Sequence, residues 1–513
     1  MKQIRLLILA LAIPLIAFAQ DTRLEEKPPR EFQFIGYSFT RMTSGNVSPT
    51  NDVLQGQVIG RLFGQNSTFT IPQTTWYFEQ RFVPMFIYKP QILDDYATFR
   101  ALFKIDYTWG DQAYGVGNNR GGAINGGQIN LQTLMANVEL RPEDANWNVV
   151  IGMQRIFDNV RDPNINTLTT AQTSAYKLSY WGTQGVGISS YIDPSPSTKL
   201  RLGMFQLWEN EISKDDDVIL WMIDFLWHPS PLIEAGIDAW YVYDKGKGGG
   251  GISILGQGLN SALADYNGAT RVKFPGVNQK YEGHIGWLGG HFAWNRDFLA
   301  SRWWIDGFFM SNFGILDTVG SSNGKISDIF GFSANASVQY KYGMTANDKV
   351  SFEALYTSGD ANGVADGTLS SVITGNVYGS PVGIYSNHRA FLLFPDPQVV
   401  NRYYSAVHDI SNMGLGVTAG FLNFYKDFIP NKLYGKVGFA AALSNNSLKG
   451  GGNFMGSEIN FEMKYNLKVF LTIGVHGAYM MTGDFYDSPL STYTGEKPKD
   501  PWTFFTTLSW LMF

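Results

Sequence analysis

Ionisable side chains occur at alternate positions within otherwise apolar segments of this chain. From Ile459 to Tyr465 every odd position is apolar and every even position is polar, and the even positions include Glu462 and Lys464. Successive side chains of a β-strand point to opposite faces of the sheet, so this segment has one apolar and one ionisable face. A row of carboxylates and ammonium groups along a strand is suited to electrostatic contact with water and hydrophilic solutes.

The same alternation assigns further polar residues to the ionisable face of other predicted strands. If the apolar faces meet lipid, these polar residues face the lumen of a closed barrel. A water-filled lumen also avoids the cost of burying many charges in a dry core, which is several kcal/mol for each unpaired ion. Charges of both signs are present, so the sequence predicts no strong cation or anion selectivity. The predicted lumen-facing residues are Arg100, Lys104, Asp106, Glu139, Arg141, Gln154, Glu234, Asp238, Lys341, Glu353, Lys432, Lys436, Glu458, Glu462, Lys464 and His476.

A second group of ionisable residues lies in the predicted long loop 359–410. Loops of this length without secondary structure are uncommon and usually functional. This one contains Phe391-Leu392-Leu393-Phe394, a run too apolar to remain exposed to water. We predict that the loop folds into the lumen as a constriction, and an external lid or a contact with a partner protein is the alternative. The candidate constriction residues are His388, Arg389, Asp396, Arg402, His408 and Asp409.

Motifs for covalent or cofactor chemistry are weak. The run 246–251 satisfies a Gly-x-Gly-x-x-Gly search, but it lies in a predicted loop with no helix after it to bind phosphate. The histidines show no metal-ligand spacing, and no serine stands out as a nucleophile. A Ser–His pair such as an outer-membrane phospholipase needs stays open, because catalytic pairs are spatial rather than sequential. We predict a protein that is not an enzyme, with no catalytic, cofactor-binding or metal-binding residues.

An acidic cluster in a predicted loop has two interpretations. Calcium or the cations bound to lipopolysaccharide could bridge its carboxylates, and a solvated charged loop is the simpler interpretation, which we favour. The cluster comprises Glu209, Glu211, Asp215, Asp216 and Asp217.

Composition restricts the fold that must position these residues. The 513 residues are 44% hydrophobic, 15% aromatic and only 16% charged, with 56 glycines and no cysteine. Ordinary soluble proteins carry about 25% charged residues. The apolar residues are interleaved with polar ones, which excludes a bundle of membrane helices, and they are too many for a disordered chain. Without cysteine there is no disulfide or thiolate chemistry. The composition favours a large all-β protein.

Alternating segments of about ten or more residues predict strands long enough to cross a bilayer. Short turns rich in Pro, Asn, Asp and Ser alternate with longer polar loops, as in bacterial outer-membrane barrels. We predict a transmembrane antiparallel β-barrel of about eighteen strands, with sixteen possible, and with short periplasmic turns and long external loops. The strands are predicted near 32–42, 73–88, 97–109, 130–141, 146–157, 183–192, 198–208, 218–228, 232–243, 280–294, 301–313, 331–343, 348–358, 411–424, 432–444, 456–467, 468–483 and 501–513.

The N-terminus resembles a secretory signal peptide. A basic start is followed by the apolar stretch 6–16 and the small residues Ala17 and Ala19. We therefore divide the chain into a signal peptide at 1–19, a short periplasmic lead at 20–31 and a barrel at 32–513. The aromatic Phe513 at the end of an amphipathic strand resembles the signal recognised by the barrel-assembly machinery. These features predict a bacterial outer-membrane location, in contact with membrane lipid and lipopolysaccharide. No basic block indicates nucleic acid.

At this point the chain resembles the alginate-export-like outer-membrane porins. The segment 148–155, Asn-Val-Val-Ile-Gly-Met-Gln-Arg, is similar to that family's strand ending in Gly-Arg-Gln, with Met153 in place of the expected Arg. The segment 353–360, Glu-Ala-Leu-Tyr-Thr-Ser-Gly-Asp, is similar to its Ser-Gly-Asp strand end before a long loop. The resemblance implies an eighteen-stranded porin and does not identify its solute.

Two functions remain open. The first is a porin for passive diffusion or export of hydrophilic solutes, such as sugars, oligosaccharides or a polysaccharide like polyuronate. The second is a plugged or partner-bound barrel that serves a secretion or export complex.

Overall fold

The computed structural model describes residues 31–49, 59–62, 68–109, 123–125, 129–157, 182–209, 211–246, 281–319, 324–374, 389–394, 396, 400, 402–407 and 410–513. The predicted signal peptide and almost all of the predicted lead lie outside these residues. So do His388, His408, Asp409 and most of the glycine-rich run 246–251.

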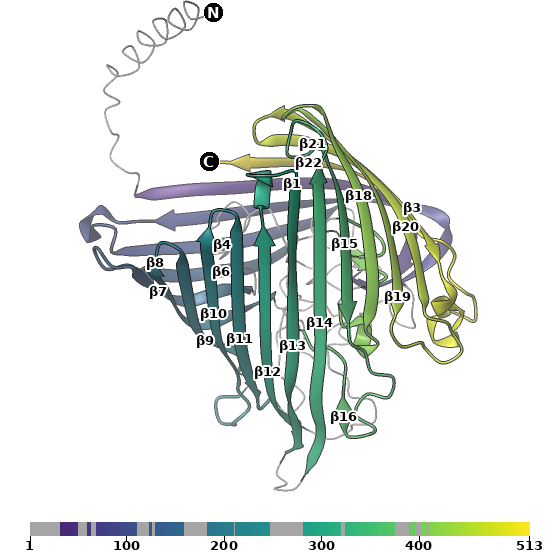
Figure 1. Cartoon of the computed structure of the whole chain (residues 1–513), viewed down its shortest axis with the longest axis horizontal. Helices are drawn as coiled ribbons and strands as arrows, with labels where there is room; N and C mark the ends of the chain where they lie inside the picture. The colour runs from purple at the N-terminus through teal and green to yellow at the C-terminus, as the bar shows by residue number, and fades with distance from the viewer. Residues whose placement is uncertain are drawn as a thin grey trace, which may run out of the picture.

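Eighteen long antiparallel strands form one closed barrel in the described part of the chain. The barrel closes because β1 pairs with both β3 and β22, so the ring of strands has no free edge. Figure 1 shows the first and last strands side by side. The barrel strands are β1 (Phe32–Pro49), β3 (Thr68–Tyr88), β4 (Ala97–Trp109), β6 (Ile129–Leu140), β7 (Trp147–Phe157), β8 (Gly182–Ser195), β9 (Thr198–Trp208), β10 (Val218–Ser230), β11 (Ile233–Asp244), β12 (Tyr281–Trp294), β13 (Trp303–Thr318), β14 (Lys325–Lys341), β15 (Lys349–Thr357), β18 (Val417–Ile429), β19 (Leu433–Ser444), β20 (Phe454–Lys468), β21 (Leu471–Thr482) and β22 (Trp502–Met512).

The described parts of the connections contain four shorter strands and five single-turn helices. The strands β2 and β17 form a small parallel sheet of their own, while β5 and β16 add to the edges of β6 and β14. None of the described helices is long and apolar enough to cross a membrane. These elements are β2 (Ile59–Arg61), β5 (Ala123–Asn125), β16 (Thr368–Leu369), β17 (Tyr403–Ser405), η2 (Gln91–Leu93), η3 (Arg296–Phe298), η5 (Asn412–Gly414), η6 (Asp484–Asp487) and η7 (Pro489–Ser491).

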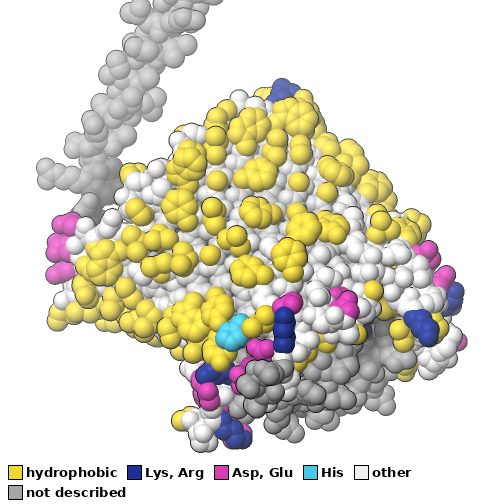
Figure 2. Space-filling view, turned by 60° about the horizontal axis from the view of Figure 1, so that its bottom comes forward, with side chains coloured by type: hydrophobic (Ala, Val, Ile, Leu, Met, Phe, Trp, Pro, Cys, Tyr) yellow, Lys and Arg dark blue, Asp and Glu magenta, His cyan; other side chains and the backbone are white. Residues whose placement is uncertain are grey.

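The alternation of side chains seen in the sequence is an alternation of exposed and buried faces. In β14, Phe330 and Phe332 are 62% and 41% exposed, whereas Ser333, Asn335 and Ser337 are at most 5% exposed. The pleat of a strand produces this pattern when one side of the sheet faces outward. Figure 2 shows the result, a broad belt of apolar side chains over the outer surface. Such a belt is typical of barrels that span a membrane.

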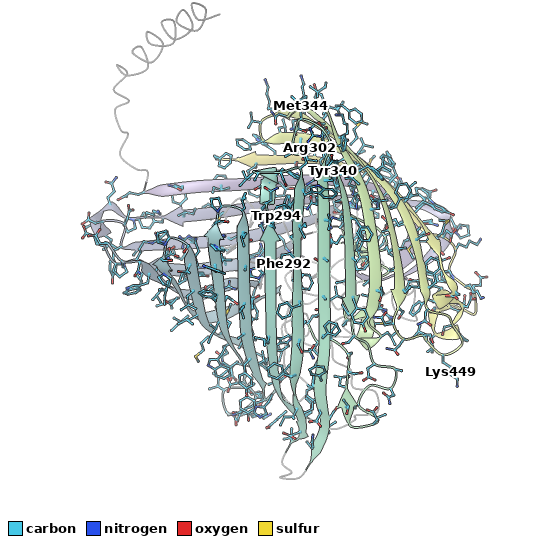
Figure 3. The ribbon with its side chains drawn as sticks, in the orientation of Figure 1. Phe292, Trp294, Arg302, Tyr340, Met344 and Lys449 are labelled. Atoms are coloured by element: carbon cyan, nitrogen blue, oxygen red, sulfur yellow. The ribbon has the colours of Figure 1, made fainter. Side chains whose placement is uncertain are left out.

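The connections between strands are mostly shorter at one end of the barrel than at the other. In Figure 3, Arg302 and Met344 lie at one end and Lys449 lies at the other. The first end carries the connections 89–96, 141–146, 196–197, 231–232, 295–302, 342–348, 430–432 and 469–470. At the second end lie the strand termini that the remaining connections join, those that follow β1, β4, β7, β9, β11, β13, β15, β19 and β21. We call these the short-turn end and the long-loop end.

The predicted barrel of about eighteen strands is confirmed, and sixteen is excluded. Each predicted strand has a counterpart, and the predicted bounds 97–109 and 198–208 match β4 and β9. The main difference lies at 43–72, where β1 continues to Pro49 and β3 already begins at Thr68. These extensions pair with each other, from Val47 opposite Thr70 to Pro49 opposite Thr68, after a bulge at Gly45. Ser, Thr and Gly residues in 43–72 are neither strongly apolar nor charged, so the alternation of apolar and polar positions is hard to recognise there.

Candidate functional site in the barrel interior

Much of the described connection between β15 and β18, including residues 389–394, is buried against the inner face of the barrel wall. Its apolar run 391–394 is held by the carboxylate of Glu458, on the buried face of β20. The Glu458 oxygens accept hydrogen bonds from the backbone N–H groups of Phe391 at 2.8 Å, Leu392 at 2.9 Å and Leu393 at 2.6 Å. Because hydrogen bonds to an ionised acceptor are the stronger kind, this carboxylate fixes the position of the run.

Side chains around Glu458 fix the start of the same segment. The Asn460 amide donates to the Arg389 carbonyl at 2.9 Å. The Arg389 guanidinium contacts the carboxylate of Glu353 on β15. The Lys436 ammonium lies 4.4 Å from the centre of the Phe391 ring. All three wall residues belong to the predicted lumen-facing set or lie beside it on the same face.

Aromatic packing completes this contact with the wall. Phe391 meets the ring of Phe505 edge-on at 5.4 Å, and Phe505 stacks on His476 at 4.4 Å. Phe394 meets Phe421 at 5.0 Å. The run 391–394 is buried throughout, as its composition requires.

Further along, the segment contacts strands on another part of the wall. Asp396 forms an ion pair with Arg41 of β1 at 2.8 Å. Arg81 of β3 donates to the carbonyl of Val400 at 3.0 Å. The backbone N–H of Arg402 donates to the carboxylate of Glu79 at 2.7 Å.

The segment then pairs with itself and with the connection that follows β1. Residues 403–405 form β17, which is parallel to β2, and the N–H groups of Ala406 and Val407 donate to the carbonyls of Leu392 and Leu393 at 2.8 and 2.9 Å. The Thr357 hydroxyl at the end of β15 donates to the Ile410 carbonyl at 2.7 Å. These bonds satisfy backbone groups that burial would otherwise leave unpaired.

The first part of the connection covers a third part of the wall. The strand β16 runs parallel to β14, and the indole N–H of Trp287 on β12 donates to the Ile373 carbonyl at 2.8 Å. The Ile373 N–H donates to the Asn312 side chain on β13 at 2.9 Å. The described contacts of this connection therefore extend from β12 through β22 to β3.

The rest of the wall, from β4 to β11, carries a series of ion pairs and polar contacts on its inner surface. Arg81 of β3 and Asp106 of β4 form a two-bond ion pair, at 2.7 and 2.8 Å, and the buried Lys104 lies on the same face. Next along the wall, Gln154 accepts from Ser189 at 2.7 Å. We call these polar side chains on the inner surface of β4–β11 the polar arc. The same strands also carry buried apolar residues, among them Phe205, Leu220 and Trp240, which belong to one cluster with Leu392 and Phe394.

Ion pairs continue along the polar arc as far as β12. Arg201 on β9 contacts Asp224 on β10, and Asp224 accepts from the indole N–H of Trp240 at 2.5 Å. Asp238 on β11 lies 3.6 Å from His291 on β12. Paired charges of both signs line this surface, which lowers the cost of keeping them away from bulk water.

The structure places the predicted lumen-facing residues in three groups. The first is buried in the wall and comprises Lys104, Asp106, Glu139, Gln154, Asp238, Glu353, Lys436, Glu458, Glu462 and His476. The second is partly buried and comprises Arg100, Glu234, Lys341 and Lys464. The third, Arg141 and Lys432, lies in short turns, because β6 and β18 end before them. Arg141 nonetheless bonds Glu139 at 2.8 Å.

The alternation of apolar and polar residues did not identify several ionisable residues of the interior. On β1 and β3 the buried face carries Tyr37 and Phe39 together with Arg41, and Val83 and Met85 together with Arg81. A rule that turns apolar residues outward misassigns such faces. Strand alternation could have identified Arg41, because residues two apart on a strand share a face and Arg41 lies two residues before the buried Thr43. The other missed residues are Glu79, Arg155, Arg201, Asp224 and Asp306.

The predicted acidic loop is largely paired. Asp215 bonds Lys245 at 2.7 Å, Glu211 bonds Lys214 at 2.6 Å, and Asp217 accepts from Gln206 at 2.8 Å. Within the described ranges, no three His, Asp or Glu side chains are placed to hold a metal ion. Asp216 is buried, and the two interpretations of the cluster stay predictions.

Comparisons with known proteins give structural similarity only. No protein-family model matches the chain, and no curated protein is similar to it in sequence. The crystal structure of OccAB4 from Acinetobacter baumannii aligns over 94% of this chain and 99% of its own, with 12% identity and a TM-score of 0.45. OccK8 (OprE) from Pseudomonas aeruginosa aligns over 94% and 98%, with 10% identity and a TM-score of 0.46. The outer membrane channel DcaP of Acinetobacter baumannii aligns over 94% and 97%, with 10% identity and a TM-score of 0.42. Similarities this low do not establish a shared function, and the resemblance to alginate-export-like porins stays a prediction.

Proposed function

We propose that this chain is a bacterial outer-membrane channel through which hydrophilic solutes pass passively. The observation that carries the proposal is the contrast between the two surfaces of one closed sheet. The outer surface is an apolar belt, and the inner surface carries paired charges from Arg81 and Asp106 to Arg201 and Asp224. An apolar exterior suits lipid, and a charged interior suits water.

The solute route follows the polar arc on one side of the interior. The connection between β15 and β18 covers the wall from β12 to β3 with an apolar core that includes Leu369, Ile373, Leu392 and Phe394. A hydrophilic solute gains nothing from that surface. Along β4–β9 the inner surface carries charged and hydrogen-bonding side chains instead, among them Arg100, which stays partly exposed. In this proposal the route is therefore off-centre in the bore.

In this proposal the segment 389–410 is a constriction. It narrows the bore by occupying the side opposite the polar arc. Arg389 contacts Glu353, and Asp396 pairs with Arg41. The backbone N–H of Arg402 donates to the carboxylate of Glu79. The described apolar run of this segment, 391–394, is buried against the wall, so in this proposal the segment narrows the channel permanently.

Planar-bilayer recording of the purified protein tests the channel and the constriction together. Replacing residues 385–405 by a short Gly-Ser linker is expected to raise single-channel conductance, because it removes the material opposite the polar arc. A matched replacement of residues 209–217, a connection at the same end of the barrel, is expected to leave conductance unchanged. Equal conductance of the wild type and the 385–405 replacement would refute the constriction.

A second candidate is a plugged or partner-bound barrel of a secretion or export complex. The observation that favours it is the extent of the interior segment, whose contacts reach β3 at one end and β12 at the other. Persistent silence of the wild type in bilayers, with open channels in the 385–405 replacement, would identify a plug. Open channels in the wild type would identify a porin.

The solute class follows from blocking experiments on the open channel. A panel of neutral sugars, oligosaccharides and polyuronates separates the classes, since a solute that enters the bore interrupts the ionic current. Polyuronates belong in the panel because of the resemblance to alginate-export-like porins. Charges of both signs along the polar arc favour neutral or zwitterionic solutes over strongly charged polymers.

A further inference from the structure

Two carboxyl groups lie directly opposite each other on the inner face of β10 and β11. The register places Asp224 opposite Asp238, and their carboxyl groups hydrogen-bond each other. An ionised carboxylate can only accept hydrogen bonds, so a bond between two carboxyl groups needs a proton on one of them. Like charges directly opposite each other on neighbouring antiparallel strands are also destabilising. Both arguments indicate that the pair holds one proton.

The row of opposed residues supplies one cation for these two acids. Arg201 on β9 lies opposite Asp224 and contacts its carboxylate. On the other side, Asp238 lies opposite Gly289 of β12, which has no side chain. The indole N–H of Trp240 donates to Asp224 at 2.5 Å and adds a donor but no charge. In this row, one guanidinium group therefore faces two carboxyl groups.

The other titratable groups around the pair do not supply the missing positive charge. His291 Nδ1 on β12 lies 3.6 Å from Asp238, but imidazole groups are ordinarily neutral in alkaline buffer. Arg296 of η3 bonds Glu234 of β11 at 2.6 Å, so this cation already has a carboxylate partner. His228 Nδ1 on β10 lies 3.8 Å from the same Glu234.

The charges of this part of the wall balance only if one proton is retained. Among the described residues, the three carboxyl groups of Asp224, Asp238 and Glu234 meet the two guanidinium groups of Arg201 and Arg296. With one shared proton the sum of these charges is zero. Without it, one negative charge is left in excess on the inner surface.

We propose that Asp224 and Asp238 share one proton and that this pair sets the ionic selectivity of the channel. This inference deepens the proposed function and rests on it. The pair acts as a unit, because interacting acids release their protons in steps that belong to both. When the shared proton passes to water, the polar arc gains one negative charge. The side chains of Arg201 and Asp224 are 10% and 14% exposed, so the added charge lies close to the interior water.

Reversal potentials of the purified protein in planar bilayers, under a potassium chloride gradient, test the role in selectivity. We expect the cation-to-anion permeability ratio of the wild type to rise about threefold or more from neutral to alkaline buffer, since a unit charge about 7 Å from a permeating ion in water has an effect of this size. Asp238→Asn keeps the shape and can still donate to Asp224, but it removes the shared proton, so the rise should be lost. Asp224→Asn removes the other partner and should lose the rise as well.

Asp106→Asn is the matched control. Asp106 is an inward carboxylate on β4 that accepts two hydrogen bonds from Arg81, at 2.7 and 2.8 Å. This variant should change the permeability ratio at every pH and keep the rise of the wild type, because the pair on β10 and β11 is intact. Other lumenal groups titrate in all the proteins compared, so the difference between variants isolates the pair.

Infrared spectroscopy of the same samples detects the shared proton without an open channel. A protonated carboxyl group has a carbonyl stretch that an ionised carboxylate lacks. In neutral buffer we expect a component of this band in the wild type and in Asp106→Asn that is lost in Asp238→Asn and Asp224→Asn. The single carboxylate that remains in these two variants is ionised beside Arg201.

An identical band in the wild type and Asp238→Asn would overturn the shared proton. An equal rise in the permeability ratio of these two proteins would overturn the role of the pair in selectivity. A silent wild-type barrel that shows the band difference would contradict the proposed channel and support the shared proton, so the two failures are distinguishable.

Discussion

Glu458 is a carboxylate of the barrel wall that binds the backbone of the interior segment. It belongs to β20, is 2% exposed, and accepts three N–H groups from residues 391–393. Its position on the polar face was predictable from the alternation 459–465. Its partners were not, because they come from a segment more than sixty residues earlier in the chain.

We predict that Glu458→Ala loosens the interior segment and destabilises the barrel. Three buried N–H groups lose an ionised acceptor, and bonds to charged groups contribute about 1.5–3 kcal/mol each. The sum is an upper bound, because water replaces part of the loss. The melting temperature in detergent should fall and the open-channel current should become noisier. Ser457→Ala, on the outward face of the same strand, should change neither quantity.

Of the structural features, the positions of the strands were the best predicted from the sequence. The bounds of β4 were predicted to the residue because its segment alternates from Ala97 to Trp109 with Leu102 as the one exception. The predicted strand 411–424 is displaced, since residues 412–414 form η5 and β18 runs from Val417 to Ile429. Local alternation cannot distinguish a buried loop from a strand when both are rich in small apolar residues.

The interior faces of β1 and β9–β11 were the least predictable part of the site. They carry Phe39, Leu220, Met222 and Trp240, which are buried although they point inward. Such residues are stable there only because other segments cover them. Their inward placement therefore depends on tertiary contacts, which no local pattern in the sequence reports.

The outward face of β14 provides a depth-dependent test of the apolar belt. We predict that Phe332→Lys, near the middle of the strand, destabilises the folded barrel in lipid by about 2–4 kcal/mol. Tyr340→Lys, on the same face near the strand end, should cost only about 0–1 kcal/mol, because the ammonium group reaches the interface there. Denaturant unfolding in lipid vesicles measures both. Equal effects would show that the belt does not face acyl chains.

At the scale of the whole molecule, the interior is divided between a covered side and the polar arc. The absence of cysteine makes this division testable with single introduced thiols. We predict that a charged methanethiosulfonate reagent reduces current through Arg100→Cys, a partly exposed position on the polar arc, more than through Ser337→Cys, which is buried beside Arg389 under the interior segment. Equal block of both variants would contradict an off-centre route.

The seam between β1 and β22 imposes an order on biogenesis. Each other pair of barrel strands is near in sequence and can form as the polypeptide arrives, whereas this one joins Gly36 to Met512 and Gly45 to Thr503. Until it forms, both margins of the sheet expose unpaired amide and carbonyl groups, which hydrocarbon does not tolerate. The growing sheet must therefore be held by an assembly factor, or kept out of the bilayer, until its last strand has arrived.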